Sequence, residues 1–179
     1  MRGFGKFILE TAKVVVIALA IILPFRAFIA QPFFVRGSSM EPSFSNGEYL
    51  IIDEVSYRFR EPRRGEVVVF RFPQDPSQFY IKRIIGLPGE TVTAEGGEIS
   101  IVHGGDKKIV REPYISRNAP QENFTLTAGP GEYTVFGDNR GASSDSRRWG
   151  TVPEKNLVGK VFVSVWPPQK LMVFAAPDY

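Results

Sequence analysis

The sequence predicts a mainly β fold, in which an antiparallel, partly closed, barrel-like domain follows one N-terminal transmembrane helix. Glycine and proline, 17 and 14 of the 179 residues, exceed their usual share and indicate many turns. Beyond one long apolar stretch near the N-terminus, short runs of β-branched and aromatic residues alternate with turn signals. Hydrophobic residues make up 43% and charged residues 23% of the chain, so we expect a packed core.

The apolar stretch covers residues 14–25 without interruption. As a helix these 12 residues rise about 18 Å, which is less than the ~30 Å hydrocarbon core of a bilayer. A helix over residues 7–30 is long enough, and Lys13 and Arg26 lie near its ends, where their side chains can reach the headgroups. We expect an uncleaved single span. The alternatives are a buried core helix and a cleaved signal peptide, for which Phe28 is too large at the −3 position.

Positive charge is concentrated at the N-terminus. Residues 1–36 carry a net charge of +4 and residues 37–179 carry −1, within a total of +3. The folded part therefore lacks the basic surface that nucleic acids require, whereas a basic terminus suits a phospholipid bilayer. The positive-inside rule favours a cytoplasmic N-terminus. We expect residues 1–30 to form a cytoplasmic tip and anchor, and residues 31–179 to form an extracytoplasmic domain at the plasma or inner membrane.

Eight strands are expected in the folded part, because apolar and β-branched runs are bounded there by glycine, proline and asparagine. They are residues 49–53, 66–71, 79–85, 91–94, 98–102, 108–110, 133–136 and 157–165. The segment over residues 104–128 has the weakest pattern, and we expect a surface hairpin and a loop there. We find no internal repeat.

The composition excludes several kinds of chemistry. Cysteine is absent, so disulfides, thiolate metal sites and cysteine nucleophiles are impossible. No metal-ligand cluster and no phosphate-binding glycine loop is present, and we predict neither a metal nor a cofactor. The single histidine, His103, precedes two glycines and is expected in an exposed turn. A serine enzyme built on this sequence would therefore use a lysine as its base.

Two short motifs supply such a pair. Ser39 lies in Gly37-Ser38-Ser39-Met40-Glu41-Pro42, a segment that by itself is compatible with a simple turn. Lys82 lies in a strand, where alternation puts it on one face with Tyr80 and Ile84. Burial beside these side chains disfavours the charged ammonium and lowers its pKa, as a general base at neutral pH requires.

Four segments together resemble the motifs of the type I signal peptidases, peptidase family S26, in both order and spacing. They are Ser39-Met40-x-Pro42, residues 64–70, residues 80–89, and Gly137-Asp138-Asn139-Arg140 continued through Ser143, Asp145 and Arg147. The resemblance covers the chain from the anchor to residue 159. It implies a domain fold shared with signal peptidases and the LexA class, and a serine endopeptidase that removes signal peptides from exported preproteins.

The resemblance also implies roles for single residues. Ser39 attacks the scissile carbonyl, Lys82 takes its proton, and Ser143 hydrogen-bonds the Lys82 amine. Asp145 and Arg147 form an ion pair, with Arg83 as a further support. The backbone N–H of Ser39 holds the oxyanion. One branch of the family has a serine hydroxyl as a second donor at the position of Gly37, so the second donor here is not identified.

The expected substrates carry small residues, usually alanine, at positions −1 and −3 before the cut. Large apolar walls would leave room for a methyl group only, so specificity would come from steric exclusion. The resemblance implies two pockets, lined at −1 by Val35, Met40, Phe44, Tyr80 and Ile81, and at −3 by Phe33, Leu50, Val69 and Ile81.

Two other functions remain open at this point. A LexA-like self-cleaving protease would share the Ser–Lys pair, but that class lacks an N-terminal anchor and usually carries a DNA-binding domain. A membrane-tethered β module that binds a partner without catalysis would not need Ser39, Lys82 and Ser143 together. We expect a monomer whose partners are preprotein signal peptides and the bilayer.

Overall fold

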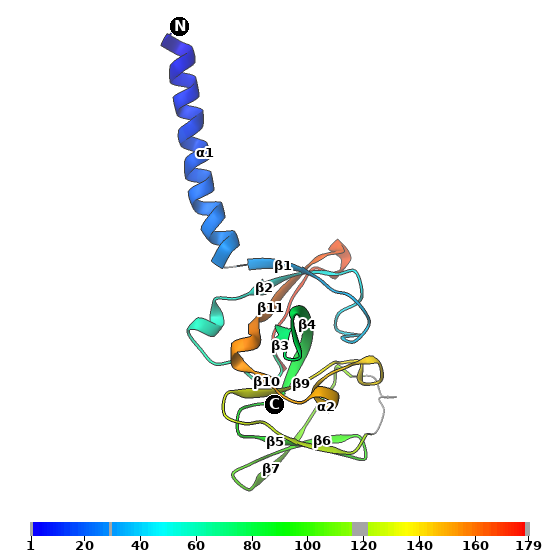
Figure 1. Ribbon diagram of the computed structural model, residues 1–179. Helices are drawn as coiled ribbons and strands as arrows, with labels where there is room; N and C mark the ends of the chain where they lie inside the picture. Colours follow the sequence, from blue (N-terminus) through cyan, green and yellow to red (C-terminus); the bar gives the residue numbers. More distant parts are fainter. Residues whose placement is uncertain (1, 29, 116–121, 178–179) are drawn as a thin grey trace.

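The computed structural model describes residues 2–28, 30–115 and 122–177 of the chain. A long helix, α1 (Arg2–Phe28), projects away from a domain built of antiparallel strands (Figure 1). The prediction of a mainly antiparallel β domain behind an N-terminal helix is therefore confirmed. Among the described residues, no helix combines the length and the apolar character needed to cross a bilayer.

The larger sheet runs through the middle of the domain, and all its neighbouring strands are antiparallel. Its strands follow each other in the order β1 (Ala30–Phe34), β2 (Tyr49–Asp53), β11 (Leu157–Trp166), β3 (Val67–Phe72), β4 (Asp75–Gly86), β9 (Glu132–Phe136) and β10 (Val152–Pro153). The short strand β12 (Met172–Val173) pairs with β11. β1 and β4 thus lie in the same sheet, although residues 35–74 separate them along the chain.

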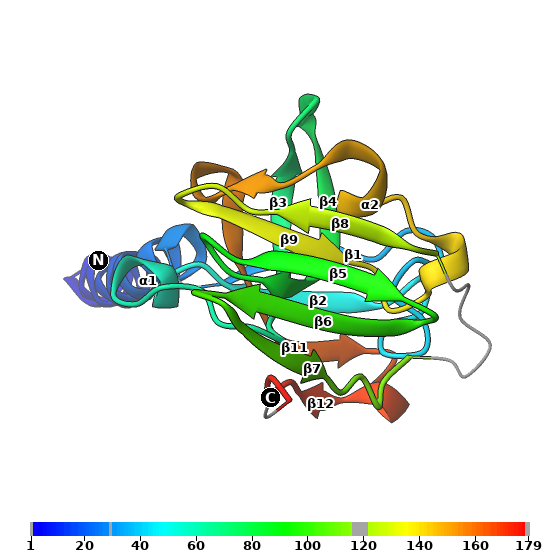
Figure 2. The ribbon, with the colours of Figure 1, turned by 90° about the horizontal axis from the view of Figure 1, so that it is seen from below.

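A smaller antiparallel sheet covers one end of the domain and lies in front of the larger sheet in Figure 2. Its order is β7 (Asp106–Val110), β6 (Glu98–His103), β5 (Thr91–Glu95) and β8 (Phe124–Thr127). Ile85 and Phe136 of the larger sheet pack with Val92 and Ile101 of the smaller one, so one apolar core joins the two sheets.

Short helical segments occupy the connections. They are η1 (Ser56–Arg58), η2 (Arg140–Ala142), α2 (Ser146–Trp149), η3 (Glu154–Asn156) and η4 (Pro168–Lys170). Asp145 accepts a hydrogen bond from the backbone N–H of Arg147 at the start of α2, which is the usual role of an aspartate before a helix.

The strand β3 shows why this sequence forms a buried central strand. Val67 and Val69 pack with Leu50 and Ile52 on one face, whereas Val68 and Phe70 pack on the other face. Because successive side chains point to opposite faces, a strand buried on both sides needs an unbroken apolar run.

Most of the predicted strands are confirmed, with shifted ends. Residues 49–53 form β2 as expected, whereas β4 starts at Asp75 rather than at residue 79. β1 was not predicted, because Pro32 disfavours a strand except at a sheet edge, where this strand lies. The hairpin predicted after residue 104 is present between β6 and β7, and His103 ends β6 exposed to solvent. β8 lies in the expected loop, part of which, residues 116–121, is outside the described residues.

Candidate active site

Ser39 lies in the loop of residues 35–48 that joins β1 to β2, here called the serine loop. Its two ends are tied together, because Val35 N donates to Glu48 O at 2.9 Å and Gly47 N donates to Val35 O at 3.0 Å. Gly37 has φ of 85°, a left-handed conformation that suits glycine, and its N–H donates to Asn46 Oδ1 at 2.9 Å. The loop is thus closed on itself before the serine.

Lys82 lies on β4 and reaches the serine loop. Its Nζ is 2.8 Å from Ser39 Oγ and donates a second hydrogen bond of 2.8 Å to the carbonyl of Ile81. The lysine is 4% exposed, and its strand neighbour across the ladder is Val68. The two residues that the sequence analysis paired, 43 positions apart, are therefore within hydrogen-bond distance in a buried site.

Burial lowers the pKa of Lys82 to about 8, although the nearby carboxylates of Asp145 and Asp138 favour the charged form and oppose the shift. The direction is the one predicted from the strand pattern. A lysine with such a pKa is neutral in roughly a tenth of the molecules at pH 7, whereas an ordinary lysine is almost wholly charged. The amine can therefore accept a proton near neutral pH.

The loop of residues 137–147 lies beside this pair. Asp145 is fully buried and accepts two hydrogen bonds from the guanidinium of Arg147, Nε to Oδ1 at 2.8 Å and Nη2 to Oδ2 at 2.9 Å. Burial would raise the pKa of Asp145, but hydrogen bonds from Arg147 and from Gly137 N, together with the nearby Ser143 hydroxyl, hold it below its usual value. The predicted ion pair between Asp145 and Arg147 is present.

Arg83 has a different acidic partner. It pairs with Asp138 through Nε to Oδ1 at 2.9 Å and Nη2 to Oδ2 at 2.5 Å, and both side chains are buried. From the resemblance we expected Arg83 to support the pair of Asp145 and Arg147, and we expected no role for Asp138. Since Lys82 and Arg83 are adjacent on β4, the pair with Asp138 fixes the strand of the lysine to the 137–147 loop.

Ser143 is buried but does not make the predicted hydrogen bond. Its side chain is 3% exposed, and Oγ has no hydrogen-bond partner among the described residues, so the expected bond to Lys82 Nζ is absent. The hydroxyl instead packs against the backbone of Gly137. A Cβ built on Gly137 would lie 2.2 Å from Ser143 Oγ and 2.4 Å from the carbonyl oxygen of Ser39.

Two residues of this loop were missed as parts of the site. Gly137 permits the close approach just described, and Asn139 bonds the serine loop directly. Asn139 N donates to Ser39 O at 3.0 Å, and Asn139 Nδ2 donates to Ser38 O at 3.1 Å. The signal available in the sequence was the Gly-Asp-Asn run itself, which the motif comparison included without assigning it a role.

A cleft of about 380 Å³ opens beside Ser39 and Lys82. Six of the eight predicted pocket residues line it: Phe33, Val35, Leu50, Val69, Tyr80 and Ile81. Its further lining residues were not predicted: Phe34, Arg36, Phe79, Ala142 and Ser144.

Met40 and Phe44, which were expected in the −1 pocket, do not line this cleft, and their assignment to that pocket stays a prediction. Both lie in the apolar core beneath the serine loop, where they are 1% and 0% exposed, and neither lines the cleft. Apolar side chains gain more free energy when they are buried in a core than when they line a solvent-filled cleft. Met40 and Phe44 therefore pack into the core under the serine loop and hold the loop in place.

Two strand edges border the cleft. Within the described chain β1 pairs with β2 alone, and β4 pairs with β9 only from Arg83 onward. The cleft-lining parts of β1 and β4 therefore present backbone N–H and C=O groups that a substrate can use. An extended peptide can bind such edges as an added strand, with alternate side chains in pockets.

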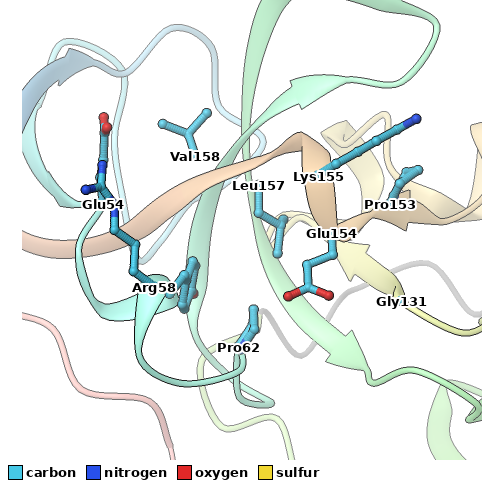
Figure 3. Close-up of a pocket in the computed structure, with 10 residues that line it drawn as sticks. Glu54, Arg58, Pro62, Gly131, Pro153, Glu154, Lys155, Leu157 and Val158 are labelled. Carbon is cyan, nitrogen blue, oxygen red and sulfur yellow. The ribbon is translucent and has the colours of Figure 1, made fainter. Parts of the chain in front are cut away.

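A larger cavity, of about 720 Å³, lies at η1, η3 and the start of β11. Figure 3 shows Arg58 near Glu54 on one side of it and Glu154 with Lys155 on the other. Charges of both signs line it, and Ser39 and Lys82 do not. In the part of the chain that the structure describes, no cluster of acidic or histidine side chains is placed to hold a metal ion.

A serine hydroxyl beside a buried lysine amine is the arrangement of the Ser–Lys hydrolases. The family model "Signal peptidase, peptidase S26" matches residues 8–166. The chain belongs to this family. It is 39% identical to the probable signal peptidase I-2 of Synechocystis over 165 residues. The matched region is 89% of this chain and 73% of that protein.

Two further comparisons extend the range of relatives. The probable thylakoidal processing peptidase 2 of Arabidopsis thaliana is 30% identical over 169 residues, which are 90% of this chain and 45% of that protein. A crystal structure of a signal peptidase I from Enterococcus faecalis is 32% identical, with a TM-score of 0.49, and covers 56% of this chain and 97% of that one.

Proposed function

We propose that Ser39 is the nucleophile and Lys82 the general base of this peptidase, which cuts after small residues. Its family makes the chain a signal peptidase I, a serine endopeptidase that removes signal peptides. The observation that carries the catalytic assignment is the 2.8 Å separation of Ser39 Oγ and Lys82 Nζ beside a peptide-sized cleft.

The proposed reaction needs these two side chains and one backbone group. Neutral Lys82 takes the proton of Ser39 Oγ while the oxygen attacks the scissile carbonyl, and the Ser39 N–H binds the resulting oxyanion. The Lys82 ammonium then protonates the leaving amine, and an acyl-enzyme remains. Lys82 next takes a proton from the water that attacks the ester. The tetrahedral intermediate then expels Ser39 Oγ, which takes this proton back from the Lys82 ammonium, and the signal peptide leaves with its new carboxylate.

Ser143 is proposed to orient the Lys82 amine. Its hydroxyl is buried beside Asp145, and its chain neighbours Ala142 and Ser144 line the cleft. A hydroxyl in this place can accept a hydrogen bond from the ammonium that forms when Ser39 gives up its proton.

Cleavage of a purified precursor tests the proposed function. We expect the chain to cut a preprotein with alanine at −1 and −3, and to cut a matched preprotein with leucine at −1 about a hundredfold more slowly, because walls such as Val35 and Ile81 leave little space. The control is the same preprotein with leucine at −2. Cleavage of the chain itself but of no precursor would support the LexA-like alternative, and no cleavage of either would support a binding module.

The pH dependence of kcat/KM is expected to follow the proton on Lys82. Because burial lowers the pKa of this group to about 8, the neutral fraction and the rate rise from acid through neutral pH and level off above pH 8. His103 is exposed and lies in the hairpin of β6 and β7. His103→Ala is therefore expected to keep both the rate and the acid limb, which is the fall of kcat/KM toward acid pH. Loss of the acid limb in His103→Ala would make the histidine the base and reject Lys82.

We also propose that residues 1–30 anchor the protein in a plasma or inner membrane with a cytoplasmic N-terminus. Phe7, Val14 and Ile17 of α1 are more than half exposed, and such side chains gain free energy in lipid. Protease added outside spheroplasts is expected to digest residues 31–179; protection of this part would reverse the topology. Relatives named as thylakoidal make an organelle membrane the other location to examine.

A further inference from the structure

We propose that Asn139 is a positioning residue for the oxyanion site: its side-chain amide orients and polarises the peptide group whose N–H receives the charge of the tetrahedral intermediate. The inference rests on the proposed function, in which the Ser39 N–H is the oxyanion donor. It gives a role to a residue that lies one hundred positions further along the chain than the serine that it serves.

The geometry connects Asn139 to that N–H through one rigid unit. Asn139 Nδ2 donates to Ser38 O at 3.1 Å. The carbonyl of Ser38 and the N–H of Ser39 belong to the same planar peptide group and point in opposite directions. Fixing the oxygen therefore fixes the direction of the N–H.

A second bond holds the next peptide group. Asn139 N donates to the carbonyl of Ser39 itself at 3.0 Å. One residue thus restrains the peptide groups on both sides of the Ser39 Cα. Rotation about φ and ψ of the serine would have to break one of these two bonds, so the N–H keeps its direction relative to the Cα–Cβ bond of the serine.

The same contacts make the N–H a stronger donor. Ser38 O accepts from Asn139 Nδ2 and also from Glu41 N at 3.1 Å. Hydrogen bonds to a carbonyl polarise the whole peptide group and strengthen its N–H as a donor, by roughly 10–30% per bond. This matters here because Gly37 offers no hydroxyl as a second oxyanion donor.

Asn139 is itself held by the ion pairs behind the site. The preceding residue, Asp138, pairs with Arg83 next to the catalytic lysine, and Gly137 N bonds Asp145. The strand of Lys82 and the backbone of Ser39 are therefore both bonded to the same short segment, residues 137–139. Movement of this segment would displace the oxyanion donor and the base together.

The chain contains a matched control. Asn156 Nδ2 donates to the carbonyl of Arg71 at 2.9 Å, which is the same kind of long-range bond, between η3 and β3. Neither Asn156 nor Arg71 lines the cleft. Asn156→Leu therefore reports what the loss of one such bond does to stability alone.

The test compares full-length Asn139→Leu, Asn156→Leu and the unchanged chain on one peptide substrate and on a peptide aldehyde with alanine at the aldehyde end. The aldehyde forms a tetrahedral adduct with the serine and so probes the oxyanion site. For Asn139→Leu we expect kcat to fall on the order of ten- to a hundredfold, aldehyde affinity to fall by a similar factor, and KM and the acid limb to stay unchanged. Asn156→Leu is expected to keep the kcat, the KM, the aldehyde affinity and the acid limb of the unchanged chain.

Unchanged kcat in Asn139→Leu, or a fall in kcat with unchanged aldehyde affinity, would overturn the inference. A shifted acid limb would also overturn it, since the effect would then act through Lys82. If Asn139→Leu does not fold, Asn139→Asp serves as the second variant. It keeps the shape of the side chain and the backbone N–H but loses the side-chain Nδ2 donor, and it is expected to show the same losses in kcat and aldehyde affinity. Activity in Ser39→Ala, or no adduct in the unchanged chain, would instead reject the proposed function.

Discussion

Ser39→Ala and Lys82→Ala are each expected to abolish precursor cleavage while the fold stays intact. The hydroxyl and the amine are 2.8 Å apart and act on the same proton, so either deletion stops the attack. For residues that act as a unit, single losses reach roughly 10⁴- to 10⁶-fold in kcat, and the double variant is no worse than either single variant. The measurement is kcat/KM of the purified variants on one peptide, with thermal unfolding to check the fold.

The controls use residues of the same types. Lys108 is exposed on β7, so Lys108→Ala is expected to keep full activity. Substantial turnover in Ser39→Ala would reject the assigned nucleophile. If Ser38→Ala were inactive at the same time, the role would pass to the neighbouring serine.

The identity of the catalytic pair could be predicted from the sequence because its two segments carry local signals. Ser39 lies in a turn segment between Gly37 and Pro42, and the alternating pattern around Lys82 predicts a strand with the lysine on an apolar face. The structure joins the two at hydrogen-bond distance. The strands with continuous apolar patterns, such as β2 and β3, could be predicted for the same reason.

Contacts to backbone atoms could not be predicted in this way. Every residue has the same carbonyl, so nothing in the sequence shows that Asn139 bonds those of Ser38 and Ser39. The direction of a side chain on an irregular loop is equally hidden, so the burial of Met40 and Phe44 in the core beneath the serine loop could not be predicted from the sequence. The ion pair of Arg83 with Asp138 also depends on the pairing of β4 with β9, which periodicity does not reveal.

Gly137→Ala is expected to lower kcat by about a hundredfold or more, because the space that a methyl group needs is already occupied. Its Cβ would lie 2.4 Å from the carbonyl oxygen of Ser39, 2.2 Å from Ser143 Oγ and 2.6 Å from Ser143 Cβ. Ser143 can turn its hydroxyl away, but the Ser39 oxygen is backbone and is bonded by Asn139 N. A displacement of about 1 Å in an active site costs on the order of a hundredfold in rate.

Two further variants separate this effect from general overpacking, which costs roughly 1–3 kcal/mol of stability. At Gly129 the three atoms nearest to the added methyl would all belong to the flexible Glu132 side chain, with Oε2 at 3.1 Å, so Gly129→Ala is expected to stay active. Combining Gly137→Ala with Ser143→Ala removes the contact with Ser143 Oγ and leaves the contacts with the Ser39 oxygen and with Cβ of residue 143. We therefore expect the double variant to recover no activity relative to Gly137→Ala. Recovery would show that Ser143, and not the backbone of the serine, is the group that needs the glycine, and wild-type kcat in Gly137→Ala would show that the site does not depend on this close contact.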